Sequence, residues 1–68
     1  MATAYLRDDH YRIIGIIKTN SSGKRIAHDA HYRRLGEYDP RSNLTRDASY
    51  RVIGSGNQLP ALIWSSVD

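Results

Sequence analysis

With 68 residues the chain has room for a single domain, residues 1–68, and a chain of this length buries only about 60% of the surface that its unfolded form exposes. The absence of cysteine excludes a disulfide framework, and no Cys/His pattern predicts a structural zinc, so self-association is expected to supply further apolar burial. Ten Lys and Arg against seven Asp and Glu give a net charge of +3, which permits an acidic partner without requiring one.

The N-terminal segment, from Met1 to Asp9, lacks the basic stretch followed by an apolar run that a secretory signal needs. No window of the sequence approaches the ~20 apolar residues of a membrane span. We therefore expect a cytoplasmic protein with no membrane association. Between Lys24 and Arg46 the basic residues have acids among them, so the sequence contains no basic arm of the kind that binds nucleic acids.

Three segments of the chain align without a gap and share the unit Asp-x-(His/Ser)-Tyr-Arg-x-(Ile/Leu)-Gly. The copies begin at Asp8, Asp29 and Asp47, which gives offsets of 21 and 18 residues. These offsets suit one β-hairpin plus one connection per unit, and they are short for a helical hairpin repeat. The three units cover approximately residues 4–23, 24–43 and 44–57.

Each unit is predicted to be one hairpin, because an apolar-x-basic-Asp stretch enters a tight turn and an alternating stretch follows it. The strands are expected near residues 4–7, 11–18, 24–28, 32–38, 43–47 and 50–54. The Asp at the turn entrance can accept backbone N–H bonds, and the aligned Gly marks a bulge, a bend or a close backbone approach. The predicted turn formers are Asp8, Asp29 and Asp47, and the predicted bend positions are Gly15, Gly36 and Gly54.

The pattern changes after the third unit, where Gly54-Ser55-Gly56-Asn57 interrupts the strand. Residues 58–65 are predicted to form a short helical turn that closes one open end of the sheet, with Pro60 tolerated near its start. Its apolar residues could form core, a dimer interface or a partner site, and on so small a chain the core or the dimer interface is favoured. These residues are Leu59, Leu62, Ile63 and Trp64.

The expected fold is therefore mainly β, with three repeated β-hairpins in an antiparallel meander or a small barrel and a short C-terminal helical turn. The repeated unit resembles the short tyrosine/aspartate (YD) repeats of Rhs-type bacterial shells and teneurins, in which Asp, a two-residue gap, Gly and Arg form a hairpin. Most of residues 5–54 take part in this resemblance, and Tyr38-Asp39 supplies one literal Tyr-Asp pair. The matching Asp/Arg positions are Asp8/Arg12, Asp29/Arg33 and Asp47/Arg51.

In this chain Tyr11, Tyr32 and Tyr50 stand where the YD family has its turn glycine. The resemblance implies a β-hairpin repeat used as a scaffold or for binding, without catalysis. It assigns no more specific function.

The repeated Tyr-Arg pairs suggest a basic, stacking surface for single-stranded nucleic acid. Adjacent residues of a strand point to opposite faces, however, so Tyr and Arg cannot both line one groove. The favoured interpretation is that Tyr packs beneath the hairpin while Arg pairs with the Asp of its own unit. The candidate nucleic-acid-binding residues are Arg12, Arg33, Arg51, Lys24, Arg25 and Arg34.

No convergent set of ionisable residues predicts an enzyme, and His28 with His31 lacks the third ligand that a metal site needs. We therefore expect a non-enzymatic binding or assembly module, without cofactor or metal, that recognises another protein and forms a homodimer. A small nucleic-acid-binding domain is the alternative. An inhibitor or adaptor of bacterial or phage-like, mobile-element origin is compatible with the size.

Overall fold

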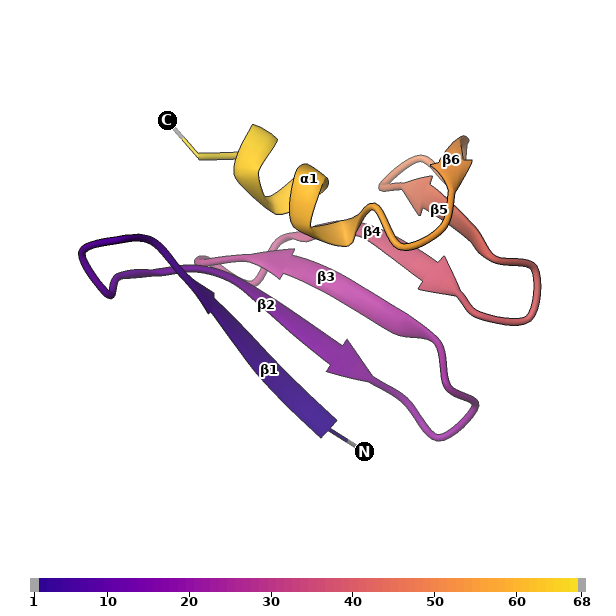
Figure 1. The fold of residues 1–68 in the computed structure, drawn as a ribbon, viewed down its shortest axis with the longest axis horizontal. Helices are drawn as coiled ribbons and strands as arrows, with labels where there is room; N and C mark the ends of the chain where they lie inside the picture. Colours follow the sequence, from indigo (N-terminus) through magenta and orange to yellow (C-terminus); the bar gives the residue numbers. More distant parts are fainter. Residues whose placement is uncertain (1, 68) are drawn as a thin grey trace.

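A computed structural model describes residues 2–67, so residues 1 and 68, the two ends of the expected domain, lie outside the described residues. Six strands form one antiparallel sheet in which each strand lies beside its neighbours in sequence (Figure 1). The elements are β1 (Ala2–Arg7), β2 (Ile13–Thr19), β3 (Arg25–Asp29), β4 (Arg34–Asp39), β5 (Leu44–Asp47), β6 (Val52–Ser55) and α1 (Leu59–Ser65). The prediction of a mainly β meander with a short C-terminal helix is confirmed, and the sheet is open rather than closed into a barrel.

The second strand of each hairpin begins two residues later than predicted. Tyr11, Tyr32 and Tyr50 have φ values of 62°, 64° and 66°, in the left-handed region that a strand cannot adopt. The tyrosines therefore belong to the turns, and β2, β4 and β6 begin at Ile13, Arg34 and Val52. The expectation that they start these strands is wrong.

All three hairpins contain the same β-bulge. In the first hairpin Leu6 lies opposite Gly15 but Arg7 lies opposite Ile13, which leaves Ile14 as an extra residue of β2. The extra residues at the equivalent places of β4 and β6 are Leu35 and Ile53. Each bulge directly precedes an aligned glycine, so of the three predicted alternatives, a bulge, a bend or a close backbone approach, the bulge is present in every unit.

The hairpins also join one another in the same register. Gly15 of β2 lies opposite Asp29 of β3, and Gly36 of β4 lies opposite Asp47 of β5. The offsets between units differ by three residues because the first connection has one more strand pair, Thr19 with Arg25, and one more loop residue than the second. The repeat in the sequence is therefore a repeat in space.

Helix α1 lies across one face of the sheet, over β2, β3 and β4 (Figure 1). Leu59 and Ile63 are fully buried and form the core together with Ile14 and Ala27. The expectation that the helix closes one end of the sheet is therefore wrong. Its apolar side chains can be buried only against the broad face of the middle strands.

Two of the aligned glycines let the helix approach the strands closely. A Cβ atom on Gly15 would overlap the side chain of Ile63, and one on Gly36 would lie 2.6 Å from Leu62 Cδ1. Any side chain at either position would hold the helix away from the sheet. The absence of a side chain at Gly15 and Gly36 thus allows α1 to pack directly against the sheet.

The opposite face of the sheet, here called the open face, carries a polar network. Glu37 is buried there and forms ion pairs with Arg34 Nη2, at 3.0 Å, and with Lys24 Nζ, at 3.4 Å. Ile16, also buried, lies between Tyr5 and His28 of the neighbouring strands. Besides the paired charges, the face that has no helix carries apolar side chains, among them Ile16 and Ile26.

Candidate functional site

The three copies of the repeated turn lie at one end of the sheet, because alternate connections of an antiparallel meander fall at the same end. We call these residues the turn row: 8–12, 29–33 and 47–51. Neighbouring turns are two strands apart, which corresponds to roughly 9.5 Å at the usual strand spacing. The row repeats one set of chemical groups three times along the edge.

Each turn is held by its aspartate in the same way. In the second turn Asp29 Oδ1 accepts hydrogen bonds from the backbone N–H groups of His31, at 2.8 Å, and Arg33, at 2.9 Å. The N–H of Asp29 donates to the carbonyl of Arg33 at 2.9 Å, and the N–H of Tyr32 donates to the carbonyl of Asp29 at 3.0 Å. Asp8 and Asp47 make the same bonds in their own turns, so the prediction that the three aspartates form the turns is confirmed.

A fourth turn, at the other end of the sheet, shows what the geometry ordinarily requires. Asn20 takes the place of the aspartate, and its Oδ1 accepts from the N–H groups of Ser22 and Lys24. The left-handed position of this turn is occupied by Gly23, with φ 90°. The turn row places a tyrosine at that position three times, against the intrinsic preference of the backbone for glycine.

The arginines of the turn row pair with the aspartates of their own turns, as predicted. Arg12, Arg33 and Arg51 place Nε 3.2, 2.7 and 3.4 Å from the aspartate Oδ2. Their side chains remain 76–80% exposed, so the outer part of each guanidinium faces solvent. Each arginine therefore supports the turn and also presents charge outward.

The aspartate carboxylates are held in the ionised form. The backbone N–H of the arginine that follows is the largest cause that lowers the pKa of Asp8, Asp29 and Asp47 below 3.8, and burial opposes it. The arginine charge adds to the lowering. These carboxylates are fixed acceptors, which suits a structural role and not proton transfer.

Two of the three tyrosines fold onto cations of the open face. The ring centre of Tyr50 lies 4.4 Å from Arg34 Cζ, and that of Tyr32 lies 5.3 Å from Lys18 Nζ. Tyr11 belongs to the first hairpin and is 81% exposed, the highest value among the large apolar and aromatic side chains described. The expectation that the tyrosines pack beneath the hairpins is therefore wrong, because they belong to turns, where the alternation of a strand does not apply, and all three are exposed.

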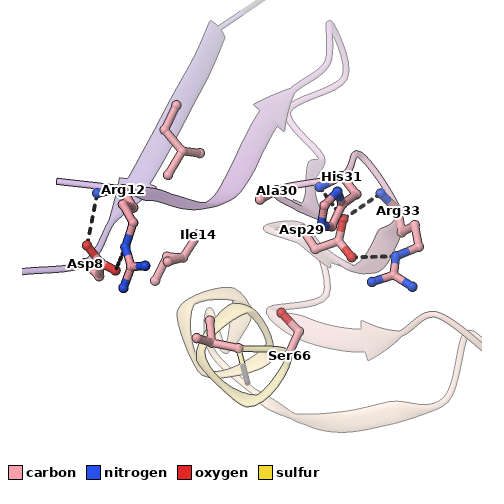
Figure 2. A pocket seen from close by; sticks show the side chains of 10 residues that line it. Asp8, Arg12, Ile14, Asp29, Ala30, His31, Arg33 and Ser66 are labelled. Carbon is pink, nitrogen blue, oxygen red and sulfur yellow. Dashed lines mark hydrogen bonds and ion pairs between the residues drawn. The ribbon is translucent and has the colours of Figure 1, made fainter. Parts of the chain in front are cut away.

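A shallow cavity of about 290 Å³ lies between the first two turns and the end of α1. Figure 2 shows the Asp8–Arg12 pair on one side and the Asp29–Arg33 pair, with His31, on the other. Ile14 and Ser66 lie between the two pairs (Figure 2). The cavity is thus lined by two Asp–Arg pairs together with the apolar side chains of Ile13, Ile14 and Val67.

Of the remaining candidate basic residues, Arg34 contacts the turn row, since it donates to the carbonyl of Ala48, whereas Lys24 and Arg25 lie away from it. Lys24 lies beside the turn at the other end of the sheet, Arg25 is exposed on β3, and Arg34 is bound to Glu37 on the open face. Of the six proposed nucleic-acid contacts, the structure therefore places three in the turn row, Arg34 beside it, and Lys24 and Arg25 elsewhere on the sheet.

The predicted interface at the C-terminus is divided in the same way. Leu59 and Ile63 are fully buried in the core of the chain, and Leu62 is half-buried beside Gly36. Trp64 is 51% exposed. Of the alternatives considered, the structure places the apolar face of α1 in the core and leaves Trp64 available to a partner.

Sequence reasoning missed two further contacts of the turn row. Arg7 Nη1 donates to the carbonyl of Tyr11 at 3.0 Å, and Arg46 Nη1 donates to that of Tyr50 at 3.3 Å. Both arginines stand directly before the turn aspartate, at equivalent positions of their units. The alignment contained this signal, which gives the first and third turns a second guanidinium.

His28 fills the equivalent position of the second unit without making that bond. Its Nδ1 is buried and has no hydrogen-bond partner among the described residues, and burial followed by the charges of Lys18 and Arg34 lowers its pKa below 6.5. His28 is consequently neutral at physiological pH. Within residues 2–67 no group of three or more His, Cys, Asp or Glu side chains has an arrangement that would hold a metal ion.

No protein-family model matches the chain, and comparison with curated proteins and with solved structures finds no match. The only helix among residues 2–67, α1, is too short to cross a membrane.

Proposed function

We propose that this chain is a non-enzymatic β-repeat module that binds protein surfaces, including a second copy of itself. One observation carries the proposal. Among residues 2–67, nine large apolar or aromatic side chains are exposed, whereas five apolar side chains are buried. A small core beside this much exposed apolar surface favours a protein that completes its burial by association.

The positions of the exposed side chains support the same proposal. Tyr11, Tyr32 and Tyr50 are anchored on rigid turns, and aromatic side chains beside arginines are the residue types that protein interfaces favour. A tyrosine held in the left-handed region costs conformational energy, and such strain is found mainly where a side chain has a function. The likeness to YD-type repeats, which the Asp and Arg spacing suggests, is consistent with a scaffold of this kind.

Sedimentation velocity of the full chain tests the proposal directly. We expect a species of at least twice the 7.7 kDa of one chain as the concentration rises from low micromolar to millimolar. A single species of 7.7 kDa at every concentration would reject self-association.

Nucleic-acid binding is the second candidate, and one specific observation favours it. Arg12, Arg33 and Arg51 present three exposed guanidinium groups along one edge at regular intervals. Phosphates are recognised by such groups, and binding that neutralises them weakens steeply with salt.

The test is a fluorescence-anisotropy titration of labelled single- and double-stranded DNA and RNA at about 50 and 200 mM salt. The matched variant replaces all three arginines by glutamine, which keeps each backbone N–H bond to its aspartate, and Arg41→Gln serves as the control. Binding that falls with salt and is lost only in the triple variant would support this function. Equal affinity of wild type and triple variant would exclude it.

A further inference from the structure

The outer edge of β1 corresponds to the edges of β3 and β5 that pair with a neighbouring strand. By the repeat alignment Tyr5 of β1 corresponds to Ile26 of β3 and Leu44 of β5, and β3 and β5 pair on this side with β2 and β4. Ile26 and Leu44 are half-buried, whereas Tyr5 is 51% exposed. Among the described residues no strand pairs with this edge of β1.

The direction of the unused backbone groups follows from the hydrogen bonds of the first hairpin. The N–H of Asp8 donates to the carbonyl of Arg12 at 3.0 Å, so the backbone groups of Asp8 point toward β2. Backbone groups alternate along a strand, and the extra bulge residue belongs to β2, so the N–H and C=O groups of three β1 residues point outward. These residues are Thr3, Tyr5 and Arg7.

The second hairpin confirms this assignment independently. Lys24 is the repeat equivalent of Thr3, and its carbonyl accepts a bond from the N–H of Asn20 across the β2–β3 connection, at 2.9 Å. The backbone of Lys24 thus points toward the preceding hairpin. In β1 the same direction leads out of the chain.

The other edge of the sheet, β6, is blunted. This strand has four residues and carries the bulge residue Ile53. The chain turns away after Ser55, because Gly56 has φ 76° and donates its N–H to the carbonyl of Asn43. Continuing the register between hairpins past β6 would give a partner strand only Gly54 and Ser55 to pair with. Short strands and bulges are the usual protection of an edge against pairing.

β1 carries none of these protections. It has six residues, it contains no proline and no charged residue before Arg7, and it supplies no bulge residue. The contrast with β6 means that β1 is the edge of this sheet suited to pairing. The occupant must therefore be a strand.

A second copy of β1 matches this edge through its own symmetry. With a two-fold axis through Tyr5, the two Tyr5 residues lie opposite each other, Thr3 lies opposite Arg7 of the second copy, and Ala4 lies opposite Leu6. Leu6 packs on the helix face of the sheet, so Ala4 shares that face and Tyr5 lies on the open face. The central pair is then aromatic, the Ala4–Leu6 pairs are apolar, and each Arg7 meets a neutral Thr3, so no two like charges lie opposite each other.

We propose that two copies of the chain join β1 to β1, antiparallel about a two-fold axis, into one continuous sheet. The proposal rests on the self-association proposed above and names the surface that produces it. Each copy keeps its turn row and its helix outside the interface.

A pair of proline variants tests this interface, with the mass in solution measured by sedimentation velocity. Tyr5→Pro removes an outward N–H and no bond within the chain, a position at which an edge strand tolerates proline. Ser55→Pro is the matched control on β6. The backbone groups of its neighbours Gly54 and Gly56 face β5, so the N–H of Ser55 also points out of the sheet. We expect at least a tenfold weaker dimer for Tyr5→Pro and an unchanged dimer for Ser55→Pro, with circular dichroism spectra like that of the wild type.

A second measurement needs no variant, and it decides the matter if Tyr5→Pro does not fold. In the wild type the amide protons of Thr3, Tyr5 and Arg7 should exchange slowly at high concentration and at least tenfold faster on dilution, while that of Ser55 exchanges at one rate throughout. A dimer that persists in Tyr5→Pro, or fast exchange of these three amides in a dimer, would overturn the β1 interface and leave self-association standing. A chain that stays monomeric would overturn both proposals.

Discussion

The guanidinium of Arg34 lies over the ring of Tyr50, with its Cζ 4.4 Å from the ring centre. The same side chain donates from Nη1 to the carbonyl of Ala48 at 3.3 Å and from Nη2 to Glu37 at 3.0 Å. Arg34 belongs to β4, whereas Tyr50 and Ala48 belong to the turn of the third hairpin. One side chain therefore ties the third hairpin to the second.

Replacing Arg34 by alanine should lower the free energy of unfolding by about 1–2 kcal/mol, since it removes the cation–π contact with Tyr50 and the hydrogen bonds to Ala48 and Glu37. Arg34→Lys should recover only part of this, because an ammonium cannot make the three contacts at once. Urea denaturation measures the change, with the exposed loop variant Arg41→Ala as control. Equal stability of Arg34→Ala and Arg41→Ala would contradict the role of Arg34.

Tyr11→Gly should raise the free energy of unfolding by about 1 kcal/mol, because glycine relieves the left-handed backbone at a side chain that is 81% exposed. Tyr50→Gly should gain less, since it also loses the contact with Arg34. Thermal or urea denaturation of the two variants gives the comparison. If Tyr11→Gly were less stable than the wild type, the Tyr11 ring would have to make contacts that outweigh the strain.

Gly36→Ala should be strongly destabilising, by roughly 2–4 kcal/mol, because the new methyl group would overlap the carbonyl oxygen of Arg46 and approach the side chain of Leu62. A backbone carbonyl in a strand cannot move aside. Gly54→Ala is the control, since its methyl would meet only Gln58 Cγ, at 3.4 Å. Comparable losses in the two variants would contradict the close approach of Arg46 and Leu62 to Gly36.

Stability should fall on acidification through the turn aspartates. Their pKa values in the folded chain lie below 3.8, the ordinary value of an aspartate, so the unfolded chain takes up these protons more readily as the pH falls. Their contribution is complete above the unfolded pKa and is lost as the pH passes down through the folded values. Urea denaturation between about pH 5 and pH 2 measures this loss.

Asp29→Asn provides the matched control for that titration. Asn20 already makes this turn with an amide oxygen, so the variant should keep the fold and reduce the pH dependence. A variant whose stability falls as steeply as that of the wild type would remove Asp29 from the explanation.

The repeat made most of the fold predictable. An eight-residue unit found three times specified three hairpins, and the turn role of the aspartates followed from the acceptor chemistry of one residue type. The bulges beside Gly15, Gly36 and Gly54 are one of the alternatives that the glycine at the same place in each unit predicted. The hydrogen bonds within a unit can be predicted from the residues of that unit alone.

Relationships between units could not be predicted in this way. The Arg34–Tyr50 contact depends on where the third hairpin lies, and Arg34 has Ile13 and Val52 at its equivalent positions. The left-handed tyrosines were also missed, because the preference of a single residue type argues for a strand and only the closed turn overrules it. The helix was placed wrongly because its seat needs Gly15 and Gly36 on different strands.

The shared register between hairpins makes the fold extensible. Gly15 lies opposite Asp29 as Gly36 lies opposite Asp47. An additional hairpin inserted between two existing ones could therefore pair with both neighbours in this same register. Gain or loss of whole units by duplication could thus change the width of the sheet and the number of tyrosines along its edge while the hydrogen bonds within each turn are kept.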